Sequence, residues 1–149
     1  MTHAPKLRTW KDRLRQIFLF EVGGLLVISP MFNLASGVPF FNAISLLALI
    51  AMIAAVWNAS FNITFDWIEG SLTGRTADQR KWSLRVVQAC SFEGGLFIIT
   101  WPIIVHWTGM SYFAAFWADI GLALAYTAYA FVFNLIYDRL FPILSAQTP

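Results

Sequence analysis

The feature that most constrains the fold is a pair of long segments that are almost free of charge. Val22 to Phe65 contain no Asp, Glu, Lys or Arg, and Gly94 to Tyr137 contain only Asp119. Each segment is long enough for two membrane-spanning helices of about 20 residues joined by a short turn. Charged residues make up 12% of the chain, about half the usual fraction in a soluble domain. The sequence therefore predicts an all-α membrane protein with four transmembrane helices.

The predicted spans cover about residues 16–36, 42–66, 86–107 and 112–138. Lys and Arg residues precede the first span, lie between the second and third, and follow the fourth, whereas the other two connections contain none. The positive-inside rule therefore places both termini and the central loop in the cytoplasm. The apolar stretch after the basic N-terminus is too long for a signal-peptide core, so we expect it to remain as the first span.

The sequence repeats itself with an offset of 72 residues. The matching pairs are Trp10 and Trp82, Arg13 and Arg85, Gln16 and Gln88, Phe20 and Phe92, Glu21 and Glu93, Gly23 and Gly95, Pro30 and Pro102, Gly37 and Gly109, Asn62 and Asn134, and Asp66 and Asp138. Each unit contains two spans, so the two units share one orientation and form a parallel repeat about an axis along the membrane normal. We expect two tandem helical hairpins, residues 1–72 and 73–149.

Each unit places a glutamate, Glu21 or Glu93, inside an apolar stretch. An isolated acid costs about 2.5–3.5 kcal/mol or more at the centre of a spanning helix, so such residues usually have a function. Both lie in the cytoplasmic half of the membrane, because Glu21 follows Arg15 by six residues and Glu93 follows Arg85 by eight. Such a carboxyl group can hold a proton in one state and a cation in another. The alternative is an acid that only pairs with a nearby arginine.

Amide and aromatic residues near these acids are the candidates for a substrate cavity. They are Gln16, Phe20, Trp57, Asn58, Asn62, Phe65, Gln88, Phe92, Tyr129, Asn134 and Tyr137. We expect each acid to face the amides and rings on the second helix of its own pair. Aromatic faces attract cations, which favours a lipophilic amine over a small inorganic ion. Alternatively, the asparagines only hold helices together through hydrogen bonds.

Other charges have different expected roles. The residues expected to gate the cytoplasmic side or to stabilise it are Arg13, Asp66, Arg85 and Asp138, with the aspartates either solvated or paired with Arg85 and Arg13. Asp119 lies in the outward half of the fourth span, where the first unit has Leu47. It is either an external proton or substrate group or a residue near the interface. We find no spacing typical of metal ligands and no motif that predicts a cofactor, an enzyme or nucleic-acid binding.

Four motifs in order carry a family resemblance. They are R-x-x-Q-x-x-x-F-E at residues 13–21 and 85–93, W-N-x-x-x-N-x-x-F-D at 57–66 and Y-x-x-x-x-N-x-x-Y-D at 129–138. This pattern resembles the proteobacterial antimicrobial compound efflux transporters, which are built from two bacterial transmembrane pair domains. The family has histidine where this chain has Gln16 and Gln88, so any proton exchange here falls to carboxylates, because glutamine does not titrate.

The resemblance implies a multi-pass antiporter of the bacterial inner membrane that is driven by protons. It implies export of cationic biocides such as chlorhexidine or acriflavine, and of short diamines, with Glu21 as the residue linked to protons and substrate. The expected partners are therefore a cationic small molecule, protons and the lipid bilayer. We also consider a homodimer, because four helices leave little room to enclose a site. A membrane accessory subunit without transport activity is the main alternative, and an inorganic-cation carrier is a weaker one.

Overall fold

The computed structural model describes residues 9–74 and 80–142, which fold into four long helices. Their bounds are α1 Trp10–Ser36, α2 Phe40–Thr73, α3 Trp82–Thr108 and α4 Tyr112–Leu140. All four are long and apolar enough to cross a membrane. The all-α fold with four spans is thus confirmed. At the end that carries most of the basic residues, α1 and α2 extend one to two turns past the predicted spans.

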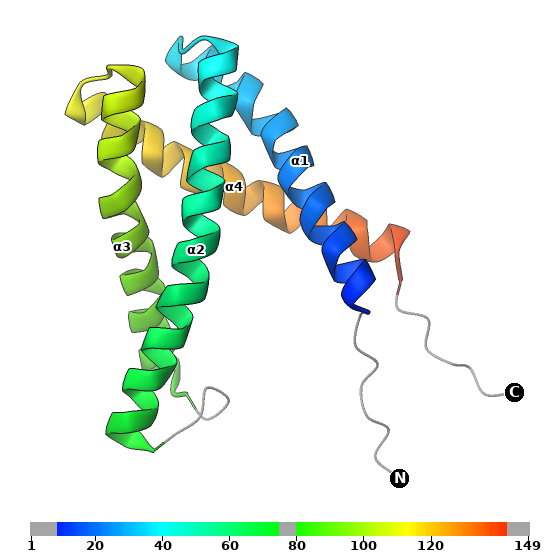
Figure 1. The fold of residues 1–149 in the computed structure, drawn as a ribbon, viewed down its shortest axis with the longest axis vertical. Helices are drawn as coiled ribbons and strands as arrows, with labels where there is room; N and C mark the ends of the chain where they lie inside the picture. The colour runs from blue at the N-terminus through cyan, green and yellow to red at the C-terminus, as the bar shows by residue number, and fades with distance from the viewer. Residues whose placement is uncertain (1–8, 75–79, 143–149) are drawn as a thin grey trace, which may run out of the picture.

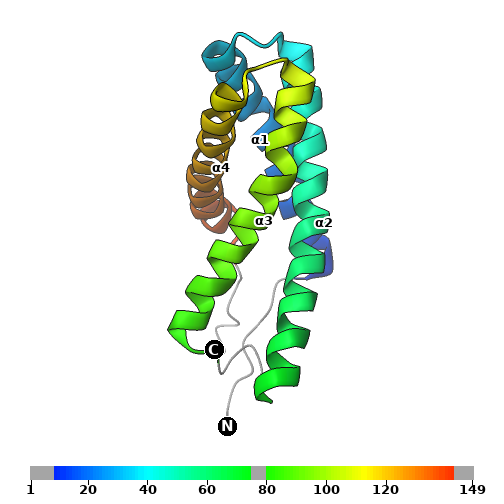
Figure 2. The same ribbon diagram turned by 90° about the vertical axis from the view of Figure 1, so that its left-hand side faces the viewer.

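Short turns with glycine join the helices within each unit. Gly37 and Gly109 end α1 and α3 in the left-handed conformation, with φ of 72° and 69°, which glycine adopts without the steric cost of a Cβ atom. Ser111 then caps the start of α4, because its side chain accepts a hydrogen bond from the backbone N–H of Ala114. Both turns lie at the same end of the molecule (Figure 2). We call this the outer end, and the opposite, cytoplasmic side the inner end.

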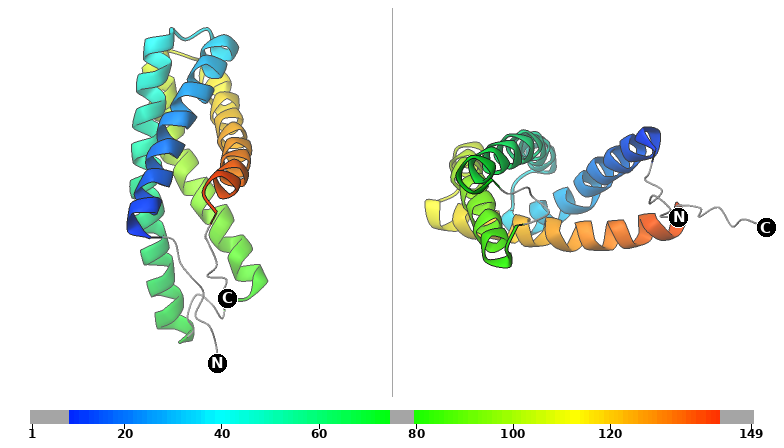
Figure 3. Two further views of the ribbon diagram at one scale, coloured as in Figure 1. Left: turned by 90° about the vertical axis from the view of Figure 1, so that its right-hand side faces the viewer. Right: turned by 90° about the horizontal axis from the view of Figure 1, so that it is seen from below.

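The four helices form a ring in which α1 and α3 each pack against both α2 and α4. The apolar core lies toward the outer end and receives side chains from every helix: Ile28, Phe32, Ala43, Leu46, Leu47, Ile104, Ala115 and Leu122. Toward the inner end, α1 and α4 lean away from α2 and α3 (Figures 1 and 3). The molecule is therefore a four-helix bundle at its outer end and separates into the pairs α1–α4 and α2–α3 at its inner end.

Candidate functional site

Glu21 lies half-buried on α1, where this helix packs against α4. Two hydrogen bonds join the helices around it. Gln16 Nε2 donates to Asn134 Oδ1 over 3.0 Å, and the Tyr129 hydroxyl donates to the carbonyl oxygen of Phe20 over 3.0 Å. We define the first site by Gln16, Phe20, Glu21, Tyr129, Phe133 and Asn134.

The same hydrogen bonds recur between α2 and α3, on the turn of α3 that precedes Glu93, although Glu93 itself is exposed. Gln88 Nε2 donates to Asn62 Oδ1 over 2.9 Å, and the Trp57 indole N–H donates to the carbonyl oxygen of Phe92 over 3.0 Å. We define the second site by Trp57, Phe61, Asn62, Gln88, Phe92 and Glu93. Each member lies 72 residues from its counterpart in the first site, so the two sites occupy equivalent positions of the repeat.

The amide and aromatic residues near each acid bond to the other repeat, and not within their own pair as expected. Gln16 and the carbonyl group of Phe20, on the turn of α1 that precedes Glu21, bond to Asn134 and Tyr129 of the second unit. The second site combines α3 with Trp57 and Asn62 of the first unit. The reason is geometric: the turn within a unit holds its two helices together at the outer end, while the inner halves lean toward the other unit. Each site is therefore assembled from both repeats.

Aromatic rings line both sites. The ring centroid of Phe20 lies 5.1 Å from that of Tyr129 and 5.3 Å from that of Phe133, and the Phe92 centroid lies 5.5 Å from that of Phe61. Phe61 was not predicted from the sequence, although it is the counterpart of Phe133 and lies one turn from Trp57. Aromatic faces next to a carboxylate are suited to binding an organic cation.

Two glycines allow these rings to approach the helices that carry the acids. A methyl group at Gly23 would collide with the Tyr129 hydroxyl, and one at Gly95 would collide with the indole ring of Trp57. Gly94, in contrast, has no other atom within 4 Å of the position that a Cβ would take. The repeated glycine two residues after each acid is thus required by close packing.

At the inner end of the first site, Tyr137 is buried and bridges two charged side chains. Its hydroxyl donates to Asp12 Oδ1 over 2.8 Å and accepts from Arg15 Nε over 3.1 Å, and Arg15 also forms an ion pair with Asp12. The Arg15 guanidinium also lies 3.8 Å from the ring centroid of Phe141. The expected gating residue Arg13 lies on the first turn of α1, and Asp138 lies near the end of α4.

At the inner end of the second site, Arg80 is the arginine that pairs with acidic side chains, as Arg15 does in the first site. It forms ion pairs of 2.5 Å with both Asp66 and Glu69. The hydrogen bond to Asp66 is the main reason why the pKa of Arg80 is raised above its usual value. Its side chain is 5% exposed and that of Glu69 is 3% exposed. The sequence predicts Arg80 only as a loop charge, because nothing in its spacing shows that it folds back onto α2.

Arg80 also connects this charge cluster to the second site. It donates to Gln88 Oε1 over 2.5 Å, Gln88 donates to Asn62, and Asn62 Nδ2 donates to Asn58 Oδ1 over 2.5 Å. Arg85 Nε donates to the carbonyl oxygen of Arg80 over 3.3 Å. A continuous series of polar groups therefore runs from the inner end toward the middle of the membrane. Phe65 covers it, with its ring centroid 5.0 Å from the Arg80 guanidinium.

Tyr126 of α4 lies near the first site and was not predicted from the sequence. Its ring lies against Gly24, it is electrostatically coupled to Glu21, and its buried hydroxyl has no hydrogen-bond partner among the described residues. Its counterpart in the first unit is Ala54, so the repeat pattern carried no signal for it. The two sites therefore differ in this aromatic residue.

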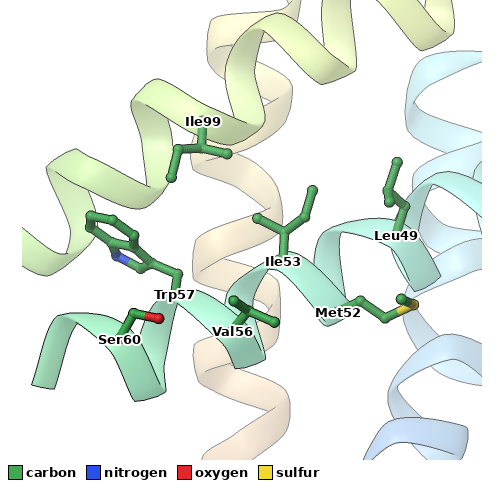
Figure 4. A pocket seen from close by; sticks show the side chains of 7 residues that line it. All are labelled: Leu49, Met52, Ile53, Val56, Trp57, Ser60 and Ile99. Atoms are coloured by element: carbon green, nitrogen blue, oxygen red, sulfur yellow. The ribbon is translucent and has the colours of Figure 1, made fainter. Parts of the chain in front are cut away.

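An apolar groove of about 300 Å³ adjoins the second site (Figure 4). Its lining residues are Leu49, Met52, Ile53, Val56, Trp57 and Ser60 of α2 and Ile99 of α3. The groove has no charged lining residue, and Ser60 is the one hydroxyl group in an otherwise apolar lining beside Trp57. Over residues 9–74 and 80–142, no group of three or more His, Cys, Asp and Glu side chains is arranged to hold a metal ion.

Known proteins provide a comparison for this arrangement. A family model described as a chlorhexidine efflux transporter matches residues 8–71 and again residues 80–143. These matches start 72 residues apart, which confirms two tandem units. No solved structure is significantly similar to the chain.

Similar curated proteins are short-chain diamines transporters. That of Acinetobacter baumannii is 31% identical over 130 residues, covering 87% of this chain and 88% of the relative. That of Vibrio parahaemolyticus is 30% identical over 139 residues, covering 90% and 93%. The four apolar helices and these relatives indicate a multi-pass bacterial membrane protein, for which the inner membrane is the fitting location. The chain belongs to the chlorhexidine efflux transporter family, the proteobacterial antimicrobial compound efflux proteins.

Proposed function

We propose that the protein is a proton-coupled antiporter that exports hydrophobic cations, short-chain diamines or both, with Glu21 and Glu93 exchanging a proton for the cation. The observation that carries the proposal is the pair of matching sites, in which amides and aromatic rings of a partner helix bind the helix turn that precedes each acid. Transport agrees with the family and with the names of the relatives. The accessory-subunit alternative has no comparable support.

The charge of each acid supports an exchange mechanism. Within the described residues, neither Glu21 nor Glu93 takes part in an ion pair. An uncompensated carboxylate inside a membrane is costly, so the group is neutralised by a proton or balanced by a bound cation. These two states exclude each other at one carboxylate. Binding of a cation from the cytoplasm therefore releases a proton, and a proton from outside displaces the cation.

We assign Gln16 and Gln88 a positioning role and not a proton-carrying one. Gln16 and Gln88 each donate to an asparagine of the other repeat, which fixes the helix that carries the acid relative to its aromatic partners. Neither side chain titrates. The carboxylates therefore carry the exchanged protons, and the amide pairs position them.

The test uses proteoliposomes that contain a pH indicator. Adding chlorhexidine or a short diamine such as putrescine to wild-type vesicles should change the lumenal pH. Glu21→Gln and Glu93→Gln should each reduce this response, and the double variant should abolish it, whereas Glu21→Asp retains a titratable group and should retain part of it. Wild-type rates in the double variant would refute the role of the acids. A response to sodium or potassium but to no amine would favour an inorganic-cation carrier.

A further inference from the structure

Asp119 and Thr100 form a polar pair at the apolar outer end. Asp119 is 8% exposed and Thr100 is 2% exposed, close in sequence to the core residues Ile104, Ala115 and Leu122. In the first repeat, the corresponding positions are held by Leu47 and Ile28, which are both buried and apolar. Only the second repeat therefore has an acid at this depth.

The two contacts of the Thr100 hydroxyl favour a protonated Asp119. Thr100 Oγ1 lies 2.7 Å from Asp119 Oδ2 and 3.0 Å from the carbonyl oxygen of Leu96. A hydroxyl has one hydrogen, and a carbonyl oxygen can only accept. If Asp119 is ionised, Thr100 must share its single hydrogen between Asp119 and Leu96. If Asp119 is protonated, it can donate to Thr100 while Thr100 donates to Leu96, so that both contacts are full hydrogen bonds.

The surroundings of Asp119 agree with a neutral acid. In the part of the chain that the structure describes, no Lys, Arg or His side chain forms an ion pair with it. The titratable group whose charge acts on it is Glu93 of α3. An ionised Asp119 would therefore be a buried charge without a counter-ion and repelled by a second acid, which is far more costly than a neutral carboxylic acid.

Asp119 also lies between Glu93 and the outer aqueous phase. It is seven residues from the start of α4 at Tyr112, a distance of about 10.5 Å along the helix axis. Its partner Thr100 is seven residues beyond Glu93, or two turns, so both residues lie on one face of α3. A proton that enters from outside reaches the depth of Asp119 before it reaches that of Glu93.

We propose that Asp119 is a third proton-binding residue of the transporter, which holds a proton while the outer end is closed and delivers it to Glu93 when the outer end opens. The delivery rests on the proposed exchange at Glu93. In this step the proton leaves Asp119 Oδ2 and passes through entering water to the carboxylate of Glu93, which releases its cation to the outside. Asp119 is left ionised and must take up a proton from outside before the core can close again. Only the second repeat therefore has a residue that delivers the proton to its glutamate, because the first repeat has Leu47 at this position.

The protonation of Asp119 can be measured without transport, by infrared spectroscopy of the purified protein in lipid bilayers. The wild type should show the carbonyl-stretch band of a protonated carboxylic acid. Protonated Glu21 and Glu93 absorb in the same region, so the Asp119 band is identified as the one that Asp119→Asn removes and that Glu21→Gln and Glu93→Gln leave in place. Thr100→Val should shift the band because its hydrogen bond is lost, and Thr100→Ser should not. An unchanged band in Asp119→Asn, or no shift in Thr100→Val, would overturn the assignment.

The delivery step is tested with the same variants in proteoliposomes. Asp119→Asn should bind a short diamine in titration calorimetry within about twofold of wild type, while its proton-driven transport falls at least about tenfold. Wild-type transport in this variant would refute the delivery role. Failure of the proposed exchange would look different: Glu21→Gln and Glu93→Gln would then transport normally, while the infrared band would still belong to Asp119.

Discussion

Replacing Gly95 with alanine places a methyl group where the indole ring of Trp57 lies. The ring is held in place, because its N–H bonds to the carbonyl oxygen of Phe92 over 3.0 Å and its centroid lies 5.5 Å from that of Phe61. Overpacking of this kind costs about 1–3 kcal/mol. Displacement of the ring would also break the hydrogen bond, a further loss of about 0.5–1.5 kcal/mol.

An opposing term reduces the net effect. Alanine is favoured over glycine inside a helix by about 1 kcal/mol, so we expect Gly95→Ala to lower the free energy of unfolding by about 1–3 kcal/mol. Gly94 is the matched control, because it lies in the same helix with no atom within 4 Å of the site of a new Cβ. Gly94→Ala should therefore gain only the helix preference of alanine, without a steric cost. The two variants should thus differ by about 2–4 kcal/mol.

The measurement is reversible unfolding by sodium dodecyl sulfate in mixed micelles, followed by circular dichroism. A double-mutant cycle with Trp57→Phe isolates the contact, because phenylalanine lacks both the indole N–H and the part of the ring that meets the new methyl group. The cost of Gly95→Ala should largely disappear in that background. Equal stability of the Gly94→Ala and Gly95→Ala variants, or an unchanged cost in the Trp57→Phe background, would refute the reasoning.

The inner end gives two further predictions, for the same unfolding assay. Arg80→Gln should lower the free energy of unfolding by about 2–3 kcal/mol. This is less than the cost of breaking a fully buried ion pair, because Asp66 is half exposed. A loss no larger than that of substituting the exposed Lys81 would contradict the buried ion pair. Gln16→Leu should cost about 0.6–1.7 kcal/mol, the range for hydrogen bonds between membrane helices. Gln88→Leu should cost more, because Gln88 also accepts from Arg80, and equal costs would argue against that bond.

The sequence was sufficient to predict the spans and the repeat, because membrane thickness fixes the length of an apolar helix and basic residues fix its orientation. It also identified Gln16, Gln88 and their asparagine partners as polar groups that need a neighbour. It did not identify which neighbour. Spacing of four residues places Asn58 and Asn62 on one face of a helix, but an offset of 72 residues is equally consistent with pairing within a repeat and between repeats.

The missed residues share a physical cause. Arg80 precedes α3, and its position over α2 depends on the path of the connection between the two helices rather than on any periodicity. Tyr126 interrupts the repeat, since Ala54 stands at the corresponding position. The partners of both residues are set by packing between helices that are distant in the sequence or joined by a loop, and local patterns do not report such packing.

The exchange of partners between repeats determines the order in which the molecule can be completed during synthesis. The second site needs α2 and α3, which follow each other along the chain, so its contacts are available before α4 has left the ribosome. The first site needs α1 and α4, the first and last helices to be made. Glu21 must therefore wait in the bilayer without Tyr129 and Asn134 until translation is nearly finished, and a nascent chain that stops after α3 holds one complete site and one unshielded acid.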